Sequence, residues 1–308
     1  MWVWALAPPS AISILPSAAH FAHIGRIGYP IPDGLGYYNR GMKKHVDLPD
    51  VASERDTRGV ALHAVGIRGL RLPIRLIGGT GNEQTVIAVA DLSVDIDAEQ
   101  RGTHMSRLVS TLYEWASAPQ SPESVYTLLQ LTQERLQSRR AQLRLQFPYF
   151  IPLAAPVSGT PGLLDVEVEW ECALNNGASS AVSFFAFPAM TLCPCSKEIS
   201  DYGAHNQRAI VRLWLRTKDR LPRLPEAYLP LVQESASALV YPVLKRPDEK
   251  YITERSYETP RFVEDVAREL TLRLQSREEL CWFRVECESI ESIHNHNAFA
   301  VYESPRGK

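Results

Sequence analysis

The order of strand-like and helix-like segments constrains the fold of this chain most, because the same order can be read twice. Each pass begins with segments rich in β-forming residues and continues with segments whose apolar residues recur every three or four positions; further strand-like segments follow. This arrangement indicates an α+β fold with antiparallel sheets and helices on one face. The repeat lies in the pattern, since the two halves show no strong residue-by-residue similarity.

The first pass begins near Gly59. A glycine-rich turn at 78–81 separates two predicted strands, and helical spacing follows from Thr103. A serine cap with a proline in the first turn, at 121–122, predicts the start of a second helix. The predicted strands of this pass are 60–67, 84–96, 143–153, 163–174 and 181–187.

The second pass begins with a predicted strand at 208–217, where apolar and other residues alternate. Helices are predicted at 230–240 and from Thr259, whose next residue is a proline suited to a first turn. Between them, the charged segment 246–250 (RPDEK) is interpreted as an exposed loop. The final segments, 280–290 and 297–302, predict a hairpin.

Composition excludes two classes of partner. The formal net charge of the 308 residues is −2, so no strong overall field attracts nucleic acid. No apolar run reaches the roughly 18 residues that a membrane span requires. We therefore expect neither a nucleic-acid nor a membrane partner.

The cysteines favour free or metal-bound thiols over a disulfide framework, because there are five of them and a single proline separates two. That predicts a reducing compartment and a cytoplasmic protein. Cys172, Cys281 and Cys287 fall in strand-like sequence, where we expect buried thiols that act as small apolar residues.

The first 41 residues differ from the rest of the chain. They are rich in Pro, Ala, Ile and Trp, show no sustained period, and have no basic segment before the apolar residues, as a secretory signal would. We expect 1–41 to be an extension without a fold of its own, or the result of a misassigned start, with Met42 as the true first residue. The remaining chain is predicted to divide into units at 42–190 and 191–308.

Two neighbouring segments, 193–197 (CPCSK) and 203–208 (GAHNQR), carry the most informative chemistry. They set Cys193, Cys195 and His205 within 13 positions, and thiolate and imidazole are good zinc ligands. On an extended segment both cysteines would lie on one side. The alternative is a loop with two packed thiols and no ligand.

A second cluster, 291–296 (ESIHNH), lies about 90 positions further on. On a strand, His294 and His296 would face the same way, whereas Glu291 would join them only through a bulge or turn. A solvated polar hairpin is the alternative. Together, the two clusters suggest one site assembled by folding.

Seven ordered motifs resemble those of the type IB GTP cyclohydrolases, a prokaryotic family. The resemblance covers roughly 45–305 and implies a tunnelling fold present twice in each chain, with paired helices on one face of each sheet. It also implies a homotetramer with active sites at subunit interfaces. The motifs are 48–51 (LPDV), 102–107 (GTHMSR), 193–197, 203–208, 246–250, 262–265 (FVED) and 291–296.

The resemblance also implies a reaction and its residues. GTP and water would give 7,8-dihydroneopterin triphosphate and formate, at the head of tetrahydrofolate biosynthesis. Cys193, His205 and Glu249 would be metal ligands, for zinc, manganese or iron(II). Cys193, His294 and Glu291 would be catalytic, the last two nearest the attacking water or serving as a further ligand, and Glu264 would bind the guanine ring.

Three questions stay open in the sequence. Lys197, Arg208 and Arg107 are candidates for binding the triphosphate, but each suits a surface charge equally well. A related tunnelling-fold enzyme, such as a nitrile reductase with a catalytic cysteine, would need NADPH and no metal. A non-catalytic protein would instead use Cys193, Cys195 and His205 to hold a structural zinc.

Overall fold

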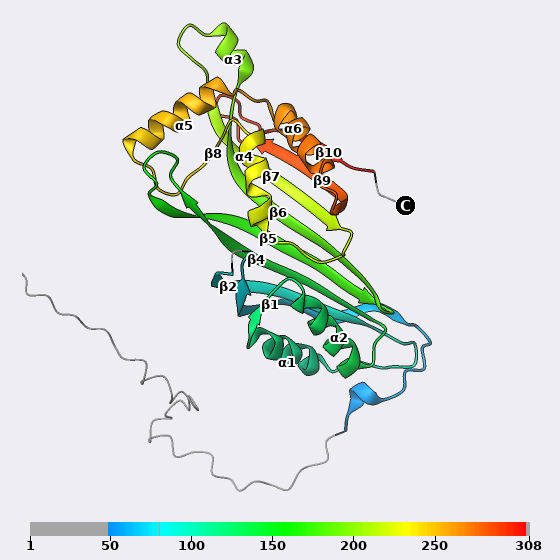
Figure 1. The fold of residues 1–308 in the computed structure, drawn as a ribbon. Helices are drawn as coiled ribbons and strands as arrows, with labels where there is room; N and C mark the ends of the chain where they lie inside the picture. The colour runs from blue at the N-terminus through cyan, green and yellow to red at the C-terminus, as the bar shows by residue number, and fades with distance from the viewer. Residues whose placement is uncertain (1–48, 80, 306–308) are drawn as a thin grey trace, which may run out of the picture. The chain divides into compact units, whose positions relative to one another are not determined.

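One sheet of ten strands runs through residues 49–79 and 81–305, the part of the chain that the computed structural model describes (Figure 1). Its order is β10-β9-β7-β6-β5-β4-β2-β1-β3, with β8 beside β6. Neighbouring strands pair antiparallel except β1 and β3, which are parallel. The strands are β1 Leu62–Ile77, β2 Glu83–Ile96, β3 Pro119–Gln120, β4 Arg140–Ala154, β5 Pro161–Asn175, β6 Ala178–Leu192, β7 Asn206–Thr217, β8 Ala238–Leu239, β9 Leu280–Ser289 and β10 Ala298–Glu303.

Four of the helices lie against this sheet in two pairs, whereas α3 projects beyond the strand ends (Figure 1). In the first half α1 and α2 pack on β1, β2 and β4, and in the second half α4 and α6 pack near β6, β9 and β10. The helices are α1 Met105–Ala116, α2 Ser124–Leu136, α3 Pro194–Ile199, α4 Leu229–Ser235, α5 Arg246–Glu258 and α6 Val263–Gln275, and the 3-10 turns are η1 Val51–Ser53 and η2 Pro225–Ala227. From Asp50 onward the described residues form one compact unit, and the predictions for 1–41 and Met42 lie outside the described residues.

The core forms because each element presents one apolar face. Along β5 every second residue is buried, and the β4–β5 register sets Phe147 beside Val168. The Phe147 ring meets Trp170 edge to face at 5.2 Å. In α6 the residues Val266, Leu270 and Leu274 recur at helical spacing and are fully buried.

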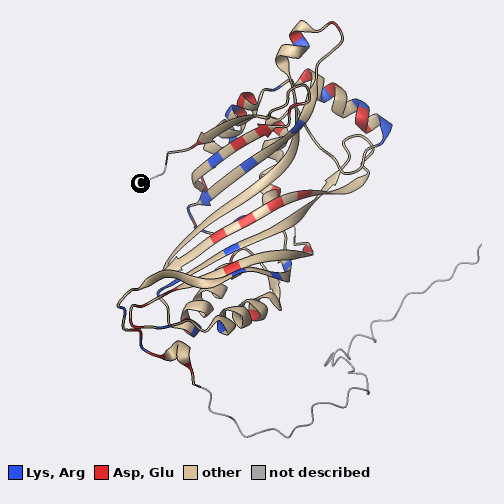
Figure 2. Cartoon of the chain, turned by 180° about the vertical axis from the view of Figure 1, so that it is seen from behind, with Lys and Arg blue, Asp and Glu red and all other residues tan. Residues whose placement is uncertain are grey.

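Acidic and basic residues lie on several strands of the sheet when it is seen from behind (Figure 2). Arg144 Nε donates to Glu169 Oε1 at 2.6 Å across β4 and β5. Arg212 on β7 pairs with Glu286 and Glu288 on β9. Alternation of apolar and charged residues therefore gives the sheet one core face and one polar face.

The sequence pattern predicted an α+β class with antiparallel sheets. The mixed α+β class and the antiparallel pairing are confirmed, and the strands form a single large sheet. The hairpin predicted at 280–302 is β9 paired with β10. No helix in the described part of the chain is both long and apolar enough to cross a membrane.

Three local predictions are wrong. The segment 246–250 is no loop but the first turn of α5, with Pro247 in that turn and Asp248 Oδ2 accepting from Lys245 N at 2.9 Å. The helix expected at 230–240 ends at Ser235, because Ala238–Leu239 pair with β6. Cys281 is exposed on β9, whereas Cys172 and Cys287 are buried as expected.

Candidate active site

A cavity of about 500 Å³ opens where four segments meet: the end of β6, the start of β7, the first turn of α6, and the turn between β9 and β10. It brings together five of the six predicted site residues, and Glu249 is not among its lining. The predicted residues that line it are Cys193, His205, Glu264, Glu291 and His294. The cavity is also lined by residues that were not predicted as site residues: Thr191, Gln207, Arg261, Phe262, Val263, Ser289, His296, Asn297, Ala298 and Phe299.

Cys193 is the N-cap of α3, so the two cysteines do not share an extended segment. Pro194 starts the helix because its fixed φ suits the first turn. The thiol Sγ of Cys193 accepts a hydrogen bond from Ser196 N at 3.4 Å. Cys195, inside the helix, is exposed and does not line the cavity.

Backbone and hydroxyl bonds tie Cys193 to His205. Cys193 N donates to His205 O at 3.1 Å. Ser196 Oγ accepts from His205 N at 3.2 Å and donates to Cys193 O at 3.3 Å. The two residues predicted as ligands are therefore held side by side, and Ser196 joins them, a role that was not predicted.

The ring of His205 has two polar neighbours. Its Nδ1 lies 2.9 Å from Gln207 Oε1 and 3.3 Å from Ser292 Oγ. The amide Nε2 of Gln207 donates to Glu291 Oε1 at 3.4 Å. The two sequence clusters therefore meet here.

The residues between β9 and β10 form the turn of the predicted hairpin, so His294 and His296 do not lie on a strand. Their rings nevertheless stack, with centroids 5.2 Å apart and planes 20° apart. At the end of the turn, Asn297 Nδ2 donates to Glu288 Oε1 at 2.9 Å. This bond and the Arg212 guanidinium hold the pKa of Glu288 below its ordinary value.

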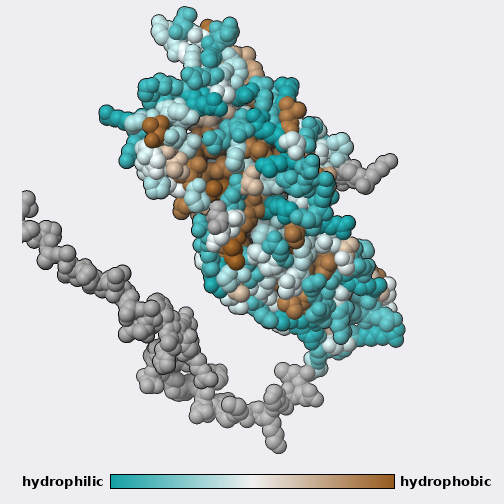
Figure 3. Space-filling view, in the orientation of Figure 1, coloured by the Kyte–Doolittle hydropathy of each residue, from teal (hydrophilic) through white to brown (hydrophobic). Residues whose placement is uncertain are grey.

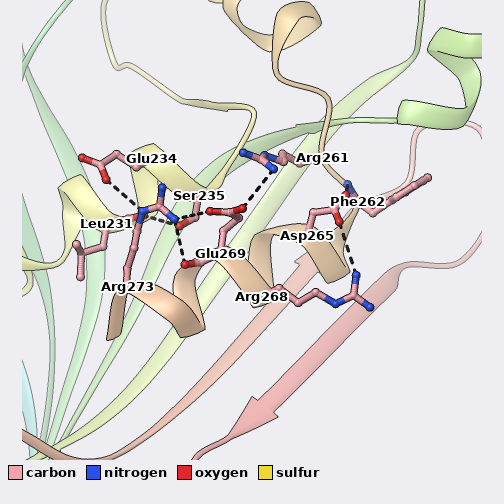
Figure 4. A network of polar contacts seen from close by, with 9 residues as sticks. All are labelled: Leu231, Glu234, Ser235, Arg261, Phe262, Asp265, Arg268, Glu269 and Arg273. Carbon is pink, nitrogen blue, oxygen red and sulfur yellow. Dashed lines mark hydrogen bonds and ion pairs between the residues drawn. The ribbon is translucent and has the colours of Figure 1, made fainter. Parts of the chain in front are cut away.

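Glu264 lies in the first turn of α6, and a network of ion pairs anchors that helix (Figure 4). Arg273 Nη1 donates to Glu269 Oε2 at 2.6 Å, and Arg273 Nε donates to Glu234 Oε2 on α4 at 3.1 Å. The Arg261 guanidinium points toward Glu269, with Nη1 to Oε1 at 3.8 Å. Because Arg261 N also donates to Leu192 O at 3.0 Å, this wall of the cavity is tied to the end of β6.

The donor set suits a borderline divalent metal, since a cysteine sulfur and an imidazole lie together in the cavity. Among residues 49–79 and 81–305, however, no three His, Cys, Asp or Glu side chains lie close enough to hold a metal ion. Glu249, the third predicted ligand, is exposed in the first turn of α5. The cavity thus contains two donors of the predicted set and lacks the third.

None of the three predicted triphosphate-binding residues lines this cavity. Lys197 Nζ donates to Tyr257 O at 2.6 Å and lies 4.3 Å from the centre of that ring. Arg107 Nη1 donates to Arg135 O at 3.2 Å. Arg261 is the one Lys or Arg among the described lining residues, and it was not predicted. Its position directly before the 262–265 motif was the available signal.

Comparison with known proteins shows the family of this chain. Residues 48–300 match the family described as type I GTP cyclohydrolase folE2. GTP cyclohydrolase FolE2 of Dictyoglomus thermophilum is 43% identical over 258 residues, which cover 83% of this chain and 98% of that protein. The protein of the same name from Akkermansia muciniphila is 43% identical over 262 residues, with coverages of 83% and 97%.

A third relative is GTP cyclohydrolase FolE2 of Bordetella avium, 42% identical over 268 residues, which cover 86% of this chain and 99% of that protein. The chain therefore belongs to the type I GTP cyclohydrolase FolE2 family. Uricase from Arthrobacter globiformis superposes with a TM-score of 0.46 at 7% identity, over 80% of this chain and 95% of that one, a likeness too weak to define the fold.

Proposed function

We propose that this chain hydrolyses GTP to 7,8-dihydroneopterin triphosphate and formate, the first step of tetrahydrofolate biosynthesis. Membership of the FolE2 family over 48–300 supports this activity. The structural observation that carries the proposal is the cavity itself. It gathers a thiol, imidazoles and two carboxylates from segments almost 100 positions apart.

In this proposal Cys193 and His205 are protein ligands of a divalent metal, which is zinc, manganese or iron(II). When bound, such a metal would activate a water molecule for attack on the guanine ring, by lowering the pKa of that water from about 15.7 towards 7. The Ser196 bonds described above hold the two ligands in place before a metal binds. A reducing cytoplasm would keep the Cys193 thiol available.

The remaining residues act on the substrate. The Glu264 carboxylate can accept parallel hydrogen bonds from the N1–H and 2-amino group of guanine, which selects guanine over adenine. His294 and Glu291 line the same cavity and can transfer protons during ring opening, since imidazole and carboxylate groups serve as general acids and bases. Cys193 contributes to catalysis as a proposed ligand of the metal.

We further propose that the chain forms a homotetramer of tandem tunnelling-fold units, 42–190 and 191–308, and that Glu249 completes the site of a neighbouring copy. Glu249 is exposed and does not line the cavity of its own chain, which supports this arrangement. Mixing inactive Cys193→Ala and Glu249→Ala chains after dissociation should restore part of the turnover. A mixture as inactive as its components would contradict the shared site.

The activity is tested with metal-stripped protein that is then supplied with Mn²⁺ or Zn²⁺. Formate and the fluorescence of oxidised neopterin should appear only with metal. Cys193→Ala and His205→Ala should abolish both products while circular dichroism stays unchanged. Cys281→Ala is the matched control, because this exposed thiol lies on β9 outside the cavity lining.

Other outcomes favour the rival functions. Near-normal turnover in both variants would refute the site. Reduction of a nitrile by NADPH without metal would favour a nitrile reductase-like enzyme. Unfolding on chelation, without turnover of GTP, would favour a structural zinc protein.

A further inference from the structure

The side chain of Gln207 bridges the two halves of the cavity. His205 directly precedes β7, and Gln207 is the second residue of that strand, so both side chains lie on the same side. Gln207 Oε1 lies 2.9 Å from His205 Nδ1, and Gln207 Nε2 lies 3.4 Å from Glu291 Oε1. One half-buried amide therefore contacts a proposed metal ligand and a proposed catalytic carboxylate.

The chemistry of these groups fixes the orientation of the amide. An ionised carboxylate only accepts hydrogen bonds, so the NH₂ end of Gln207 must face Glu291. The carbonyl end then faces His205, and a carbonyl oxygen only accepts. His205 Nδ1 must therefore carry the proton.

This assignment decides the state of the other ring nitrogen. In a neutral imidazole only one nitrogen carries hydrogen, so His205 Nε2 keeps its lone pair. Ser292 Oγ, 3.3 Å from Nδ1, can accept from the same N–H and supports the same tautomer. A metal-binding imidazole needs such a lone pair and a fixed partner on its other nitrogen.

We infer that Gln207 is a positioning residue, which sets the His205 tautomer for metal binding and holds the Glu291 carboxylate beside it. This inference rests on the proposed metal site. It gives Gln207 two separable tasks: accepting from His205 Nδ1, and donating to Glu291.

Two substitutions separate these tasks. Gln207→Leu removes both, and we expect metal affinity and turnover each to fall about 10- to 100-fold. Gln207→Glu still accepts from Nδ1–H but cannot donate to Glu291. It should therefore bind metal at least as tightly as the native protein while turnover falls about 10-fold or more. Gln142→Leu, a half-buried glutamine on β4 outside this cavity, is the matched control and should change neither.

The direct readout is the ¹⁵N NMR spectrum of histidine-labelled, metal-free protein near pH 8. We expect the Nδ1–H tautomer for His205 in the native chain and in Gln207→Glu, and a shift towards Nε2–H in Gln207→Leu. An Nε2–H tautomer in the native chain, or unchanged metal affinity in Gln207→Leu, would overturn the inference. Because this spectrum needs no metal, it is independent of the Cys193→Ala and His205→Ala experiments that test the proposed function.

Discussion

At the scale of single residues, Glu264 is expected to recognise the substrate rather than hold the metal. Glu264→Gln replaces a charged acceptor by a neutral amide. Hydrogen bonds to charged groups contribute about 1.5–3 kcal/mol, so KM for GTP should rise roughly 10- to 100-fold. Steady-state kinetics and metal analysis check this, with the exposed Arg268→Gln on the same helix as control. A change confined to metal content would contradict the role.

The buried cysteines should make the protein less stable in alkali. Burial raises the pKa of Cys172 to about 12, and burial with nearby Glu264 raises that of Cys287 to about 12, from an ordinary value of 9.0. The folded state then holds protons that the unfolded state loses, so stability is fully present below pH 9 and falls between pH 9 and 12. The slope is about 1.4 kcal/mol per pH unit for each thiol.

Urea unfolding of the native chain and of the double variant Cys172→Ala, Cys287→Ala at pH 8, 9 and 10 measures this slope. The variant should lose less stability per pH unit, whatever its stability at pH 8. The exposed Cys281→Ala serves as control and should keep the native slope. Parallel curves for the native chain and the double variant would contradict the assignment.

The sequence indicated the cavity residues whose side chains carry strong chemistry. Cys193, His205, Glu264, Glu291 and His294 were all predicted, and one cavity gathers them. Ser196 and Gln207 were not predicted, because the role of a hydroxyl or an amide depends on the groups with which it forms hydrogen bonds. Such contacts depend on β7, α3 and the β9–β10 turn meeting in space, which local sequence does not encode.

At the scale of elements, α5 depends on one buried carboxylate. Asp248 is fully buried, and its oxygens accept from Val157 N at 2.8 Å, Ser158 N at 2.8 Å, Ser158 Oγ at 2.7 Å and Lys245 N at 2.9 Å. These bonds join the turn between β4 and β5 to the first turn of α5, next to Glu249. Burial alone would raise the pKa of Asp248, but the hydrogen bonds outweigh it and hold that pKa below its ordinary value.

We therefore expect Asp248→Asn to lower the free energy of unfolding and to weaken metal binding through a displaced Glu249. Since the folded-state pKa is depressed, the stabilisation is present above about pH 4 and is lost as pH falls below it. Urea midpoints of the two proteins should thus differ most at pH 6–8 and converge in acid. Lys250→Gln, which breaks an exposed pair with Glu254, is the control. A constant difference at all pH values would contradict a role for the Asp248 charge.

Elements with a strong local period were predictable, and those fixed by distant contacts were not. The alternating strands and α6 carry clear apolar patterns. In α5 only Ile252 and two polar residues are buried, so no apolar stripe marked it as a helix. The two residues of β8 form a strand only because β6 lies beside them.

At the scale of the whole sheet, both edges are open in the described part of the chain. β10 has β9 on one side alone, and beyond β1 only the two residues of β3 pair, at Arg75 and Leu76. Hydrophobic residues also gather towards the middle of the face that Figure 3 shows, which is the face seen in Figure 1. Open sheet edges and exposed apolar surface favour association. A second copy beside β10 would therefore pair the backbone groups of that edge, which are unpaired in the single chain.

The tetramer can be tested at that edge. Val301 on β10 is 45% exposed and lines the groove between α6 and β10. Val301→Asp would place an unpaired charge in the proposed contact, so light scattering should show a mass below four chains. Since the proposed site takes Glu249 from a neighbouring copy, turnover per chain should fall at low protein concentration and recover as concentration rises.

Tyr113→Asp introduces the same charge at an exposed position of α1 and should leave both mass and turnover unchanged. If Val301→Asp keeps the mass of four chains, β10 does not lie in the interface. If the native chain is monomeric and fully active, each chain must complete its own site, and Glu249 must then lose its proposed role as a ligand.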